Sequence, residues 1–553
     1  MKEYTLSALK DLCERAPVKA FVERVQREYA DKFEGKEIVT PSYLNYKRIA
    51  LDGNRKAYEK EYFELRTRLA YLEVLAVWDD EYLADLEEVL SRICDSFTWV
   101  LPAHAYTQNG VFDYHRVDLF SAETAFYLAE AAVVFHEKLY PDLVNRIRAS
   151  VEEKAFAFLD GKGTWWKTCD NNWASVCAGS LGAAYLYLCP ERFEEVAPLV
   201  FGCMERFLSG FDADGVCQEG IGYWEYGFGF FALFYDVYQK RTGIRAEILD
   251  TPKVKNILKY SINACLEGDI YLPFADGGSA SFVPSAYTVY AVKNLFPEYA
   301  LPKMQVKITE KALGFRILEG LAEYGEQEER ATRDEFTYYK DSEVYIRRAD
   351  GFVFTAKGGH NDELHNHNDV GAFELVAGGK RIVTDIGAGE YTWEYFNLRG
   401  ENGRYGKKIF VCSALAHSVP IVDGKEQVEG RTFRGKVLCA GEEEFRLDIA
   451  GAYKNPIEKL EVCYRVEKKG LRVSYQTKGA NTIAFRFVCE YEPKKKDGFV
   501  EIEGVKLTAS KDLPVQICAE PYSTHAAQEN KAYTVDFIAS GADAERVEFF
   551  FEV

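Results

Sequence analysis

The chain has 553 residues, of which 47% are hydrophobic and 14% aromatic, and its formal net charge is −19 at pH 7. This length exceeds one ordinary core, so we expect two large domains, and the apolar content excludes a disordered chain. The negative charge repels nucleic acid and anionic membranes. An acidic ligand therefore needs a local basic cluster, and short polyanions are easier to capture than long ones.

The sequence shows no targeting segment and no disulfide framework. The first residues, MKEYTLSALKDLCERAP, contain no apolar run behind a basic start, and no later window approaches twenty uncharged apolar residues. Neither a signal peptide nor a membrane span is therefore expected. The thirteen cysteines are scattered and never form a C-x-x-C pair, so we expect reduced, mostly buried thiols in a cytoplasmic protein.

Helical periodicity dominates the first half of the chain. From about Tyr43 to about Phe296, apolar positions recur at helical spacing, as in YFELRTRLAYLEVLAVW and SAETAFYLAEAAVVFHEKLY. Many helices with short connections are typical of antiparallel hairpins in a bundle, a solenoid or a toroid. The lack of a strict repeat at a fixed period argues mildly against a simple solenoid.

Strand periodicity follows LFPEYALPKMQ. From about Phe336, short runs alternate apolar and polar residues between Gly, Asp and Asn, as in SEVYIRRADGFVFTAKGG and NTIAFRFVCEYE. Helices followed by strands without interleaving indicate two domains, the second an antiparallel β-sandwich. We expect the boundary between about Leu301 and Phe336, and we assign residues 1–310 to the helical domain and 311–553 to the sandwich.

Three of the eight histidines lie within eight residues, in GGHNDELHNHND. If LHNHND is extended, the side chains of His365 and His367 share one face, because strand side chains alternate. A metal needs a third ligand, and Asp385 of IVTDIG and His417 of SALAHSVPIVDG each lie beside an expected strand. Two imidazoles and a carboxylate suit zinc. The alternative is a hydrogen-bonded polar loop, which an H-x-H pair by itself favours.

Paired asparagines precede an expected helix in TCDNNWASVCAGSLGAAYLYL, residues 168–188. The structural interpretation is a helix cap, because Asp170, Asn171 or Asn172 can accept a hydrogen bond from a first-turn N–H. Only one cap is needed. The second amide is then free to contact a ligand.

A glycine-punctuated loop, DADGVCQEGIGYWEYGFGFF, carries polar and aromatic side chains directly before another helix. Loops on rigid scaffolds often bind ligands, and tyrosine and tryptophan suit the faces and hydroxyls of a sugar. The alternative for the aromatic residues is a staple between helices. For Glu219 the alternative is a carboxylate at a helix start.

Taken in order, DNNW, QEGIGYW, HNHNDVGAFEL, TDIGAGEYT and AHSVPIVDG resemble the heparinase II/III family of polysaccharide lyases, from about residue 100 to about residue 430. The resemblance implies an N-terminal α/α toroid, an incomplete helical barrel, followed by a C-terminal antiparallel β-sandwich. It also implies β-elimination of uronate glycans such as heparin, heparan sulfate, chondroitin, hyaluronan or alginate. This reaction needs a donor to the carboxylate, a base, and an acid for the leaving oxygen.

The resemblance also assigns catalytic roles by motif. Asn172 would contact the substrate carboxylate, with Asn171 as the second choice. Some relatives have a histidine beside this asparagine, where this chain has Trp173. Tyr223 would be the acid, and the role of base is also open to it, with Tyr226 as the alternative. His365 would act as base or as carboxylate neutraliser.

His367, Asp385 and His417 would bind a structural zinc ion that braces the loop of His365. The segment FNLRGENGRYGKKIF could attract a uronate or sulfate through Arg404, or be a solvated basic loop; Tyr405 within it is a further candidate phenol. The expected substrate contacts are Asn171, Glu219, Trp224, Tyr226, His360, Arg404 and Tyr405.

These observations favour a lyase that acts on acidic oligosaccharides or polysaccharides, with exolytic cleavage of short chains inside the cell. One alternative is a glycoside hydrolase on a helical toroid, which needs two carboxylates such as Glu219 and Glu225 and leaves the histidines unexplained. Another is a glycan-binding protein without activity. The oligomeric state, a homo-oligomer included, is left open.

Overall fold

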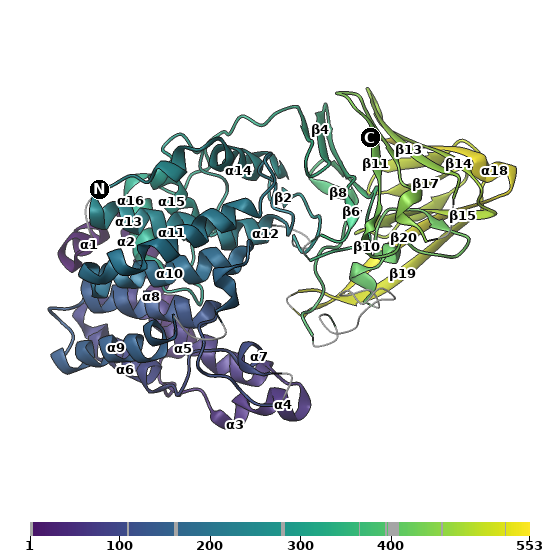
Figure 1. Ribbon diagram of the computed structural model, residues 1–553. Coiled ribbons are helices and arrows are strands. Elements are labelled where there is room, and N and C mark those ends of the chain that lie inside the picture. Colours follow the sequence, from purple (N-terminus) through teal and green to yellow (C-terminus); the bar gives the residue numbers. More distant parts are fainter. Residues whose placement is uncertain are drawn as a thin grey trace. The chain divides into compact units, whose positions relative to one another are not determined.

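The computed structural model describes residues 4–107, 110–159, 164–277, 282–363, 365–392, 395, 409–454, 457–525 and 527–553. The chain forms two compact units (Figure 1). The first consists of Met1–Gly210, Glu225–Val254 and Val283–Ala331; the second consists of Phe211–Trp224, Lys255–Phe282 and Thr332–Val553. Two segments of the expected helical region therefore pack with the strands, and a domain division at residue 310 stays a prediction.

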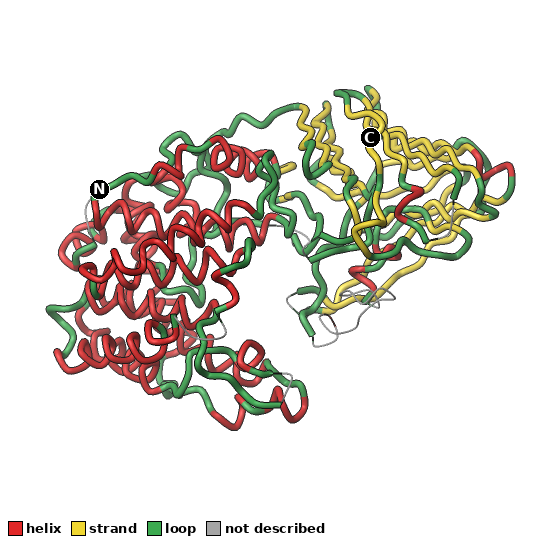
Figure 2. Tube along the Cα trace, in the orientation of Figure 1, coloured by secondary structure: helices red, strands yellow, loops and turns green. Residues whose placement is uncertain are grey.

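The first unit is helical, as the red segments of Figure 2 show. Its helices are α1 (Leu6–Cys13), α2 (Ala16–Phe33), α3 (Tyr43–Tyr46), α4 (Arg48–Asp52), α5 (Lys56–Trp78), α6 (Leu83–Asp95), α7 (Pro102–Ala105), α8 (Leu119–Val134), α9 (Pro141–Lys154), α10 (Asn172–Leu188), α11 (Phe193–Ser209), α13 (Gly229–Thr242), α15 (Ala286–Leu295) and α16 (Gly314–Glu323). Helix α14 (Pro252–Asn263) runs across the division between the units.

Neighbouring helices of the first unit close a ring. They pack in the order α5, α6, α9, α8, α10, α13, α15, α16 and back to α5. Nearly every residue of α8 and α10 is buried, as expected of helices that are apolar all round. This closed circuit confirms the α/α toroid expected for the N-terminal part of the chain.

A buried ion pair ties three helices of the ring together. Arg316 of α16 forms a bidentate pair with Glu130 of α8, with Nη2 2.8 Å from Oε1. Tyr187 of α10 donates its hydroxyl hydrogen to the same carboxylate at 2.6 Å. Removing one partner of such a buried pair costs about 3–5 kcal/mol, because the other charge is left uncompensated.

Among its described residues, the second unit contains the strands and two short helices, α12 (Ile221–Tyr223) and α18 (Ala542–Glu545). Its strands are β1 (Cys265–Glu267), β2 (Ile270–Tyr271), β3 (Phe336–Tyr339), β4 (Val344–Ala349), β5 (Phe352–Lys357), β6 (His360–Asn361), β7 (Phe373–Ala377), β8 (Lys380–Val383), β9 (Ile421–Val422), β10 (Gly430–Arg434), β11 (Lys436–Ala440), β12 (Glu444–Asp448), β13 (Lys459–Glu467), β14 (Gly470–Lys478), β15 (Thr482–Cys489), β16 (Lys494–Lys496), β17 (Phe499–Ile502), β18 (Val505–Ala509), β19 (Val515–Ser523), β20 (Glu529–Ser540) and β21 (Arg546–Glu552).

Three antiparallel sheets share one core in this unit. Their strand orders are β11-β12-β13-β14-β21-β18-β17-β16, β3-β4-β5-β7-β8 and β19-β20-β15-β9. Side chains from all three sheets, such as Phe354 of β5, Val462 of β13 and Phe485 of β15, lie in one apolar cluster. Burial alternates along β13 and β14, as it does where one sheet face meets a core. The expected β-sandwich is confirmed, and β3 begins at Phe336.

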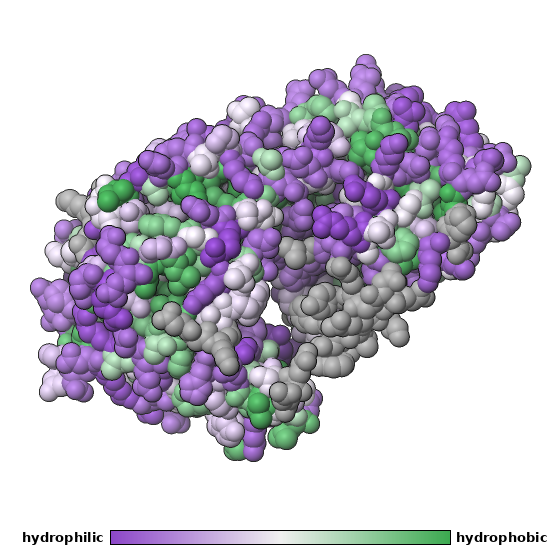
Figure 3. Space-filling model, viewed as in Figure 1, coloured by the Kyte–Doolittle hydropathy of each residue, from purple (hydrophilic) through white to green (hydrophobic). Residues whose placement is uncertain are grey.

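The surface agrees with the composition. The face of the molecule seen in Figure 3 is mostly hydrophilic, with apolar residues scattered among polar ones. All thirteen cysteines are free, and each is buried or half-buried. Within the described part of the chain, no helix has the length and apolar character needed to cross a membrane.

Candidate functional site

The loop before α12 brings two segments of the second unit together. Gly220 adopts a φ of +101°, which only glycine tolerates easily, and a Cβ at this position would overlap the backbone of Gly277. The chain then enters α12 and continues as a π-helical turn, Trp224–Phe228. Tyr223, at the end of α12, is thereby held beside the loop that carries Asp276.

The carboxylate of Asp276 accepts hydrogen bonds from four side chains. Its Oδ2 lies 2.5 Å from Nδ1 of His365 and 2.6 Å from the hydroxyl of Tyr391. Its Oδ1 lies 3.1 Å from Nε2 of His367 and 2.6 Å from the hydroxyl of Tyr395. An ionised carboxylate has about four acceptor positions, so these donors fill its capacity.

Tyr223 joins this network through Tyr391 and lies beside His365. Its hydroxyl lies 2.9 Å from that of Tyr391, and Tyr391 donates to Asp276, so Tyr223 donates to Tyr391. The ring centroids of Tyr223 and His365 are 4.6 Å apart. On the other edge of His365, Nε2 lies 3.5 Å from Oε2 of Glu219. One phenol and one imidazole thus lie together, each held by a carboxylate network.

The two histidines do not share the face of a strand, as they would in an extended chain. His365 adopts a φ of +52°, and residues 365–369 form no strand. The nearby carboxylate of Asp369 lies 3.0 Å from Nζ of Lys357. A left-handed conformation in a residue other than glycine costs about 1–3 kcal/mol and is often found at functional sites. The turn lets both imidazoles reach the same carboxylate.

Burial and neighbouring charges shift the pKa values of Asp276, His365 and Tyr223 in different directions. Burial raises the pKa of Asp276, but the hydrogen bonds and charges of His365 and His367 outweigh it and hold the pKa well below its usual range. Burial lowers the pKa of His365, whereas Asp276 and then Glu219 raise it above its ordinary value. Burial raises the pKa of Tyr223, so this phenol keeps its proton near neutral pH.

A second group of buried side chains fits a metal ion. Ligand atoms of His367, Asp385 and His417 all lie within 4.8 Å of one another. Nδ1 of His367 is 3.1 Å from Nε2 of His417, which is 3.4 Å from Oδ2 of Asp385. That Oδ2 atom is buried and has no hydrogen-bond partner among the described residues. A cation between two imidazole nitrogens and an orphaned carboxylate oxygen would satisfy all three.

The surroundings of this group orient its ligand atoms. Nδ1 of His417 lies 2.8 Å from the carbonyl oxygen of Ser413, so Nδ1 carries the proton and Nε2 offers its lone pair. The other oxygen of Asp385 accepts the N–H of Gly387 at 2.8 Å. Burial raises the pKa of Asp385, but its neighbours His417 and then His367 lower it below its ordinary value. The carboxylate is therefore available as an anionic ligand.

Residues 331–473 match the family described as "Heparinase II/III-like, C-terminal". The predicted resemblance is thus confirmed for the part of the chain that carries the histidines. None of the curated proteins matches the sequence significantly.

Solved polysaccharide lyases have the same fold at low sequence identity. A heparinase III has a TM-score of 0.63 and 14% identity, over 99% of this chain and 91% of that one. The heparan sulfate lyase HepC of Pedobacter heparinus has a TM-score of 0.57 and 13% identity, over 98% and 91%. A chondroitin AC lyase of Streptomyces coelicolor, in complex with chondroitin sulphate, has a TM-score of 0.58 and 10% identity, over 99% and 82%. These similarities establish the fold.

Of the paired asparagines in the heparinase-like motif, one caps a helix and the other does not. Asn171 is the N-cap of α10, and its side chain accepts the backbone N–H of Trp173 at 3.1 Å. Asn172 is buried in the first turn, and the cap does not use its amide. The structural interpretation therefore holds for Asn171, and Asn172 stays the predicted substrate contact. Asn172 belongs to the first unit and Tyr223 to the second.

Two aromatic residues of the predicted site are engaged in packing contacts. Trp224 is buried, and its indole N–H donates to the carbonyl oxygen of Ile257 at 3.2 Å, while its contact with a sugar stays a prediction. Tyr226 belongs to the first unit, and its hydroxyl donates to Glu123 at 2.6 Å. Burial and Glu123 raise the pKa of Tyr226 well above its usual value.

The other predicted substrate contacts are Glu219, His360, Arg404 and Tyr405. Glu219 is buried and faces His365, as described above. His360 is half-buried in β6, paired with β10. Arg404 and Tyr405 lie outside the described residues.

Sequence reasoning missed three members of the network. Tyr391 lies within TDIGAGEYT, a motif already noted, but a tyrosine after a glycine-rich turn has no special pattern. Tyr395 follows four residues later. Asp276 lies in PFADGG, and an aspartate before two glycines is the usual signature of a turn. Only tertiary contacts distinguish these residues.

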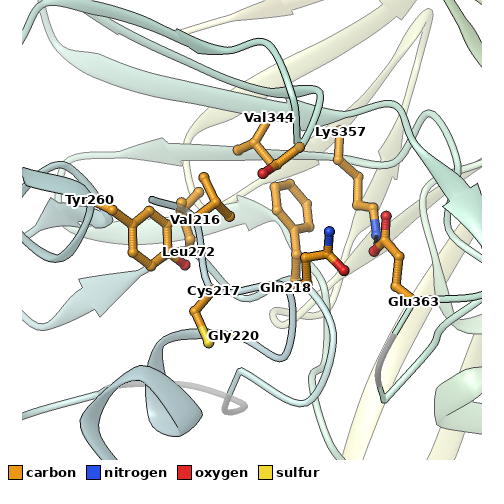
Figure 4. A pocket seen from close by; sticks show the side chains of 11 residues that line it. Val216, Cys217, Gln218, Gly220, Tyr260, Leu272, Val344, Lys357 and Glu363 are labelled. Atoms are coloured by element: carbon orange, nitrogen blue, oxygen red, sulfur yellow. Dashed lines mark hydrogen bonds and ion pairs between the residues drawn. The ribbon is translucent and has the colours of Figure 1, made fainter. Parts of the chain in front are cut away.

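A small cavity beside the network is too narrow for a sugar. Figure 4 shows its lining, which includes Gln218, Tyr260 and Leu272, with Lys357 and Glu363 at one side. Its volume of about 30 Å³ has room for water molecules only. Nζ of Lys357 lies 2.9 Å from Oε2 of Glu363, so the charges at its edge neutralise one another. We therefore place no substrate there.

Proposed function

We propose that this protein is a lyase that cleaves uronate-containing glycans by β-elimination. The observation that carries the proposal is the pairing of a protonated phenol, Tyr223, with an imidazole, His365, through one buried carboxylate. The heparinase-like family match and the lyase fold support it. An acidic glycan is the substrate class, because the similar chondroitin lyase is described with chondroitin sulphate bound.

The network supports a division of labour between base and acid. Nδ1 of His365 faces Asp276, so Nε2 is the atom that can take the proton next to the uronate carboxylate. The carboxylate of Asp276 makes this imidazole a stronger base, in line with its raised pKa. The electron pair released forms the double bond and expels the glycosidic oxygen.

The leaving oxygen needs a proton, which Tyr223 can supply. Its raised pKa keeps the phenol protonated before the reaction. After turnover His365 holds one proton more and Tyr223 one fewer, so His365 must release a proton to solvent and Tyr223 must regain one, from solvent or through Tyr391. The family resemblance implies that the amide of Asn172, a residue of the first unit, would contact the substrate carboxylate, and this role stays an expectation of the resemblance.

The proposed metal is zinc. His367, Asp385 and His417 would hold it, since two imidazole nitrogens and one carboxylate oxygen suit this ion. When bound, it would supply a structural crosslink between the segments that carry these residues. Its proposed role is to stabilise the loop of His365, which lies two residues before His367.

One assay separates the three classes of function. The protein is incubated with glycosaminoglycans, alginate and other uronate glycans, and ultraviolet absorbance and reducing ends are followed together. The lyase proposal predicts both signals, because an unsaturated uronate absorbs. Reducing ends without absorbance would indicate a hydrolase, and neither signal would indicate a binding protein. If no uronate glycan yields the chromophore, the proposal fails.

A further inference from the structure

Asp276 links the two histidine sites of the second unit through its two oxygen atoms. Oδ2 faces Nδ1 of the proposed base His365, and Oδ1 faces Nε2 of the metal-group residue His367. We propose that Asp276 is a positioning residue that holds both imidazoles, so that the metal group and the catalytic histidine share one carboxylate. The catalytic half of this inference rests on the proposed function.

The carboxylate is built into a site that leaves it little freedom. Its side chain has no exposed surface. The preceding residue, Ala275, adopts a φ of +59°, and Gly277 after it lies against Gly220. Tyr391 and Tyr395 each donate to one of its oxygens at 2.6 Å. A carboxylate held by four donors and by the backbone on both sides can fix the rings that contact it.

The contact with His367 sets the direction of a metal-ligand atom. Because Nε2 faces Asp276, Nδ1 is the nitrogen that faces His417 and Asp385. Metal-binding histidines commonly direct their other ring nitrogen at a carboxylate, and loss of that partner typically costs 10–100-fold in metal affinity or activity. Asp276 is this carboxylate partner for His367.

The contact with His365 sets the direction of a reacting atom. Nδ1 faces Asp276, so Nε2 lies on the opposite edge of the ring, near Glu219. The side chain of His365 is 23% exposed, whereas that of His367 is fully buried. Only the first imidazole is accessible to a substrate. One carboxylate thus holds a buried ring for the metal group and a partly exposed ring for chemistry.

The substitution Asp276→Asn tests both contacts, because it keeps the size of the side chain but replaces one acceptor oxygen with an N–H donor. Zinc affinity is measured by competition with a chelator, and kcat and KM are measured at saturating zinc. We expect zinc affinity and kcat each to fall about 10–100-fold, with KM changed less than about threefold. Asp214→Asn is the matched control, because Asp214 of the same unit instead bonds the backbone and hydroxyl of Ser342.

Unchanged zinc affinity, or unchanged kcat at saturating zinc, would overturn the shared role. Thermal unfolding shows whether each variant is folded. If Asp276→Asn is not, Asp276→Ser, which adds no amide donor, is measured with the same two expected results. The zinc measurement needs no substrate. A wild-type protein without lyase activity would therefore reject the proposed function, while the zinc measurement would still decide the contact with His367.

Discussion

Burial separates the tasks of the two histidines in HNH at the residue scale. His367 is enclosed between Asp276 and His417, and His365 lies between Asp276 and Glu219 with part of its ring exposed. A substrate can reach only the exposed ring. The pair is therefore better described as one proposed metal ligand, His367, and one proposed reacting group, His365, than as two ligands of one metal.

In the proposed mechanism, turnover depends most directly on the phenol of Tyr223. Tyr223→Phe removes the hydroxyl that donates to Tyr391 and keeps the ring that packs against His365. We expect kcat to fall by about 10²–10⁴, because a general acid is lost, with zinc content and unfolding temperature unchanged. Tyr226→Phe, measured in parallel, tests the alternative acid. Near-normal activity of Tyr223→Phe would place the acid at another residue.

The metal group is tested by His417→Ala. This substitution removes the imidazole that faces both His367 and Asp385. We expect zinc content, measured by mass spectrometry of the native protein, to fall from about one ion per chain to almost none, and the unfolding temperature to fall with it. A variant that retains its zinc would contradict the ligand assignment.

At the scale of elements, the turn before α12 depends on glycine. Gly220 combines a φ of +101° with close contact to Gly277, so Gly220→Ala adds both backbone strain and overlap. We expect about 2 kcal/mol or more of destabilisation and a lower kcat, because the loops of Tyr223 and Asp276 move apart.

Gly268 offers the matched comparison for this substitution. It has a φ of +59° in the same unit, but a Cβ there would meet nothing within 4 Å. Gly268→Ala should cost only about 1 kcal/mol and leave kcat unchanged. Chemical unfolding measures both variants, and equal losses of stability would refute the proposed overlap at Gly220.

Helix α5 contains a buried carboxyl group that makes stability depend on pH. Glu73 is fully buried, and neither oxygen has a hydrogen-bond partner among the described residues. Burial, and then Glu130, raise its pKa well above the ordinary value. The folded protein keeps this proton while the unfolded chain loses it above about pH 4.3, so wild-type stability falls as pH rises above that value.

Glu73→Gln should therefore stabilise the protein increasingly with pH. The gain over wild type is expected to be small near pH 4.5 and to grow by up to about 1.4 kcal/mol per pH unit between pH 5 and pH 8. Glu64→Gln, an exposed position on the same helix, is the control. Urea unfolding at pH 5 and pH 8 measures the difference in stability between Glu73→Gln and wild type. A gain that does not depend on pH would show that Glu73 is ionised in the folded state.

At the scale of the whole molecule, local periodicity was sufficient to predict a helical part followed by a β-sandwich. Helical spacing and then strand alternation place the first strand of the sandwich at Phe336, where β3 begins. The closing of helices into a ring was known only from the family resemblance. Periodicity also did not reveal that Phe211–Trp224 and Lys255–Phe282 pack with the sandwich, because residues far apart in sequence make these contacts.

The site was predictable to the extent that motifs carry it. The structure brings together the three predicted metal ligands, His367, Asp385 and His417. Each of them lies beside an apolar strand, and the packing of that strand buries it. Asp276 was not foreseen, since 89 positions separate it from His365 and its own surroundings have the composition of a turn. The sequence also did not reveal that Trp224, a predicted substrate contact, is buried.

The central claim is that the glycosidic bond is broken by elimination. Mass spectrometry of the products from a defined uronate oligosaccharide tests this most directly, with Tyr223→Phe as the inactive control. The account predicts two fragments whose masses add up to that of the intact substrate, one with an unsaturated uronate at its end. Fragments that together exceed the substrate by the mass of one water molecule would show hydrolysis and contradict the account.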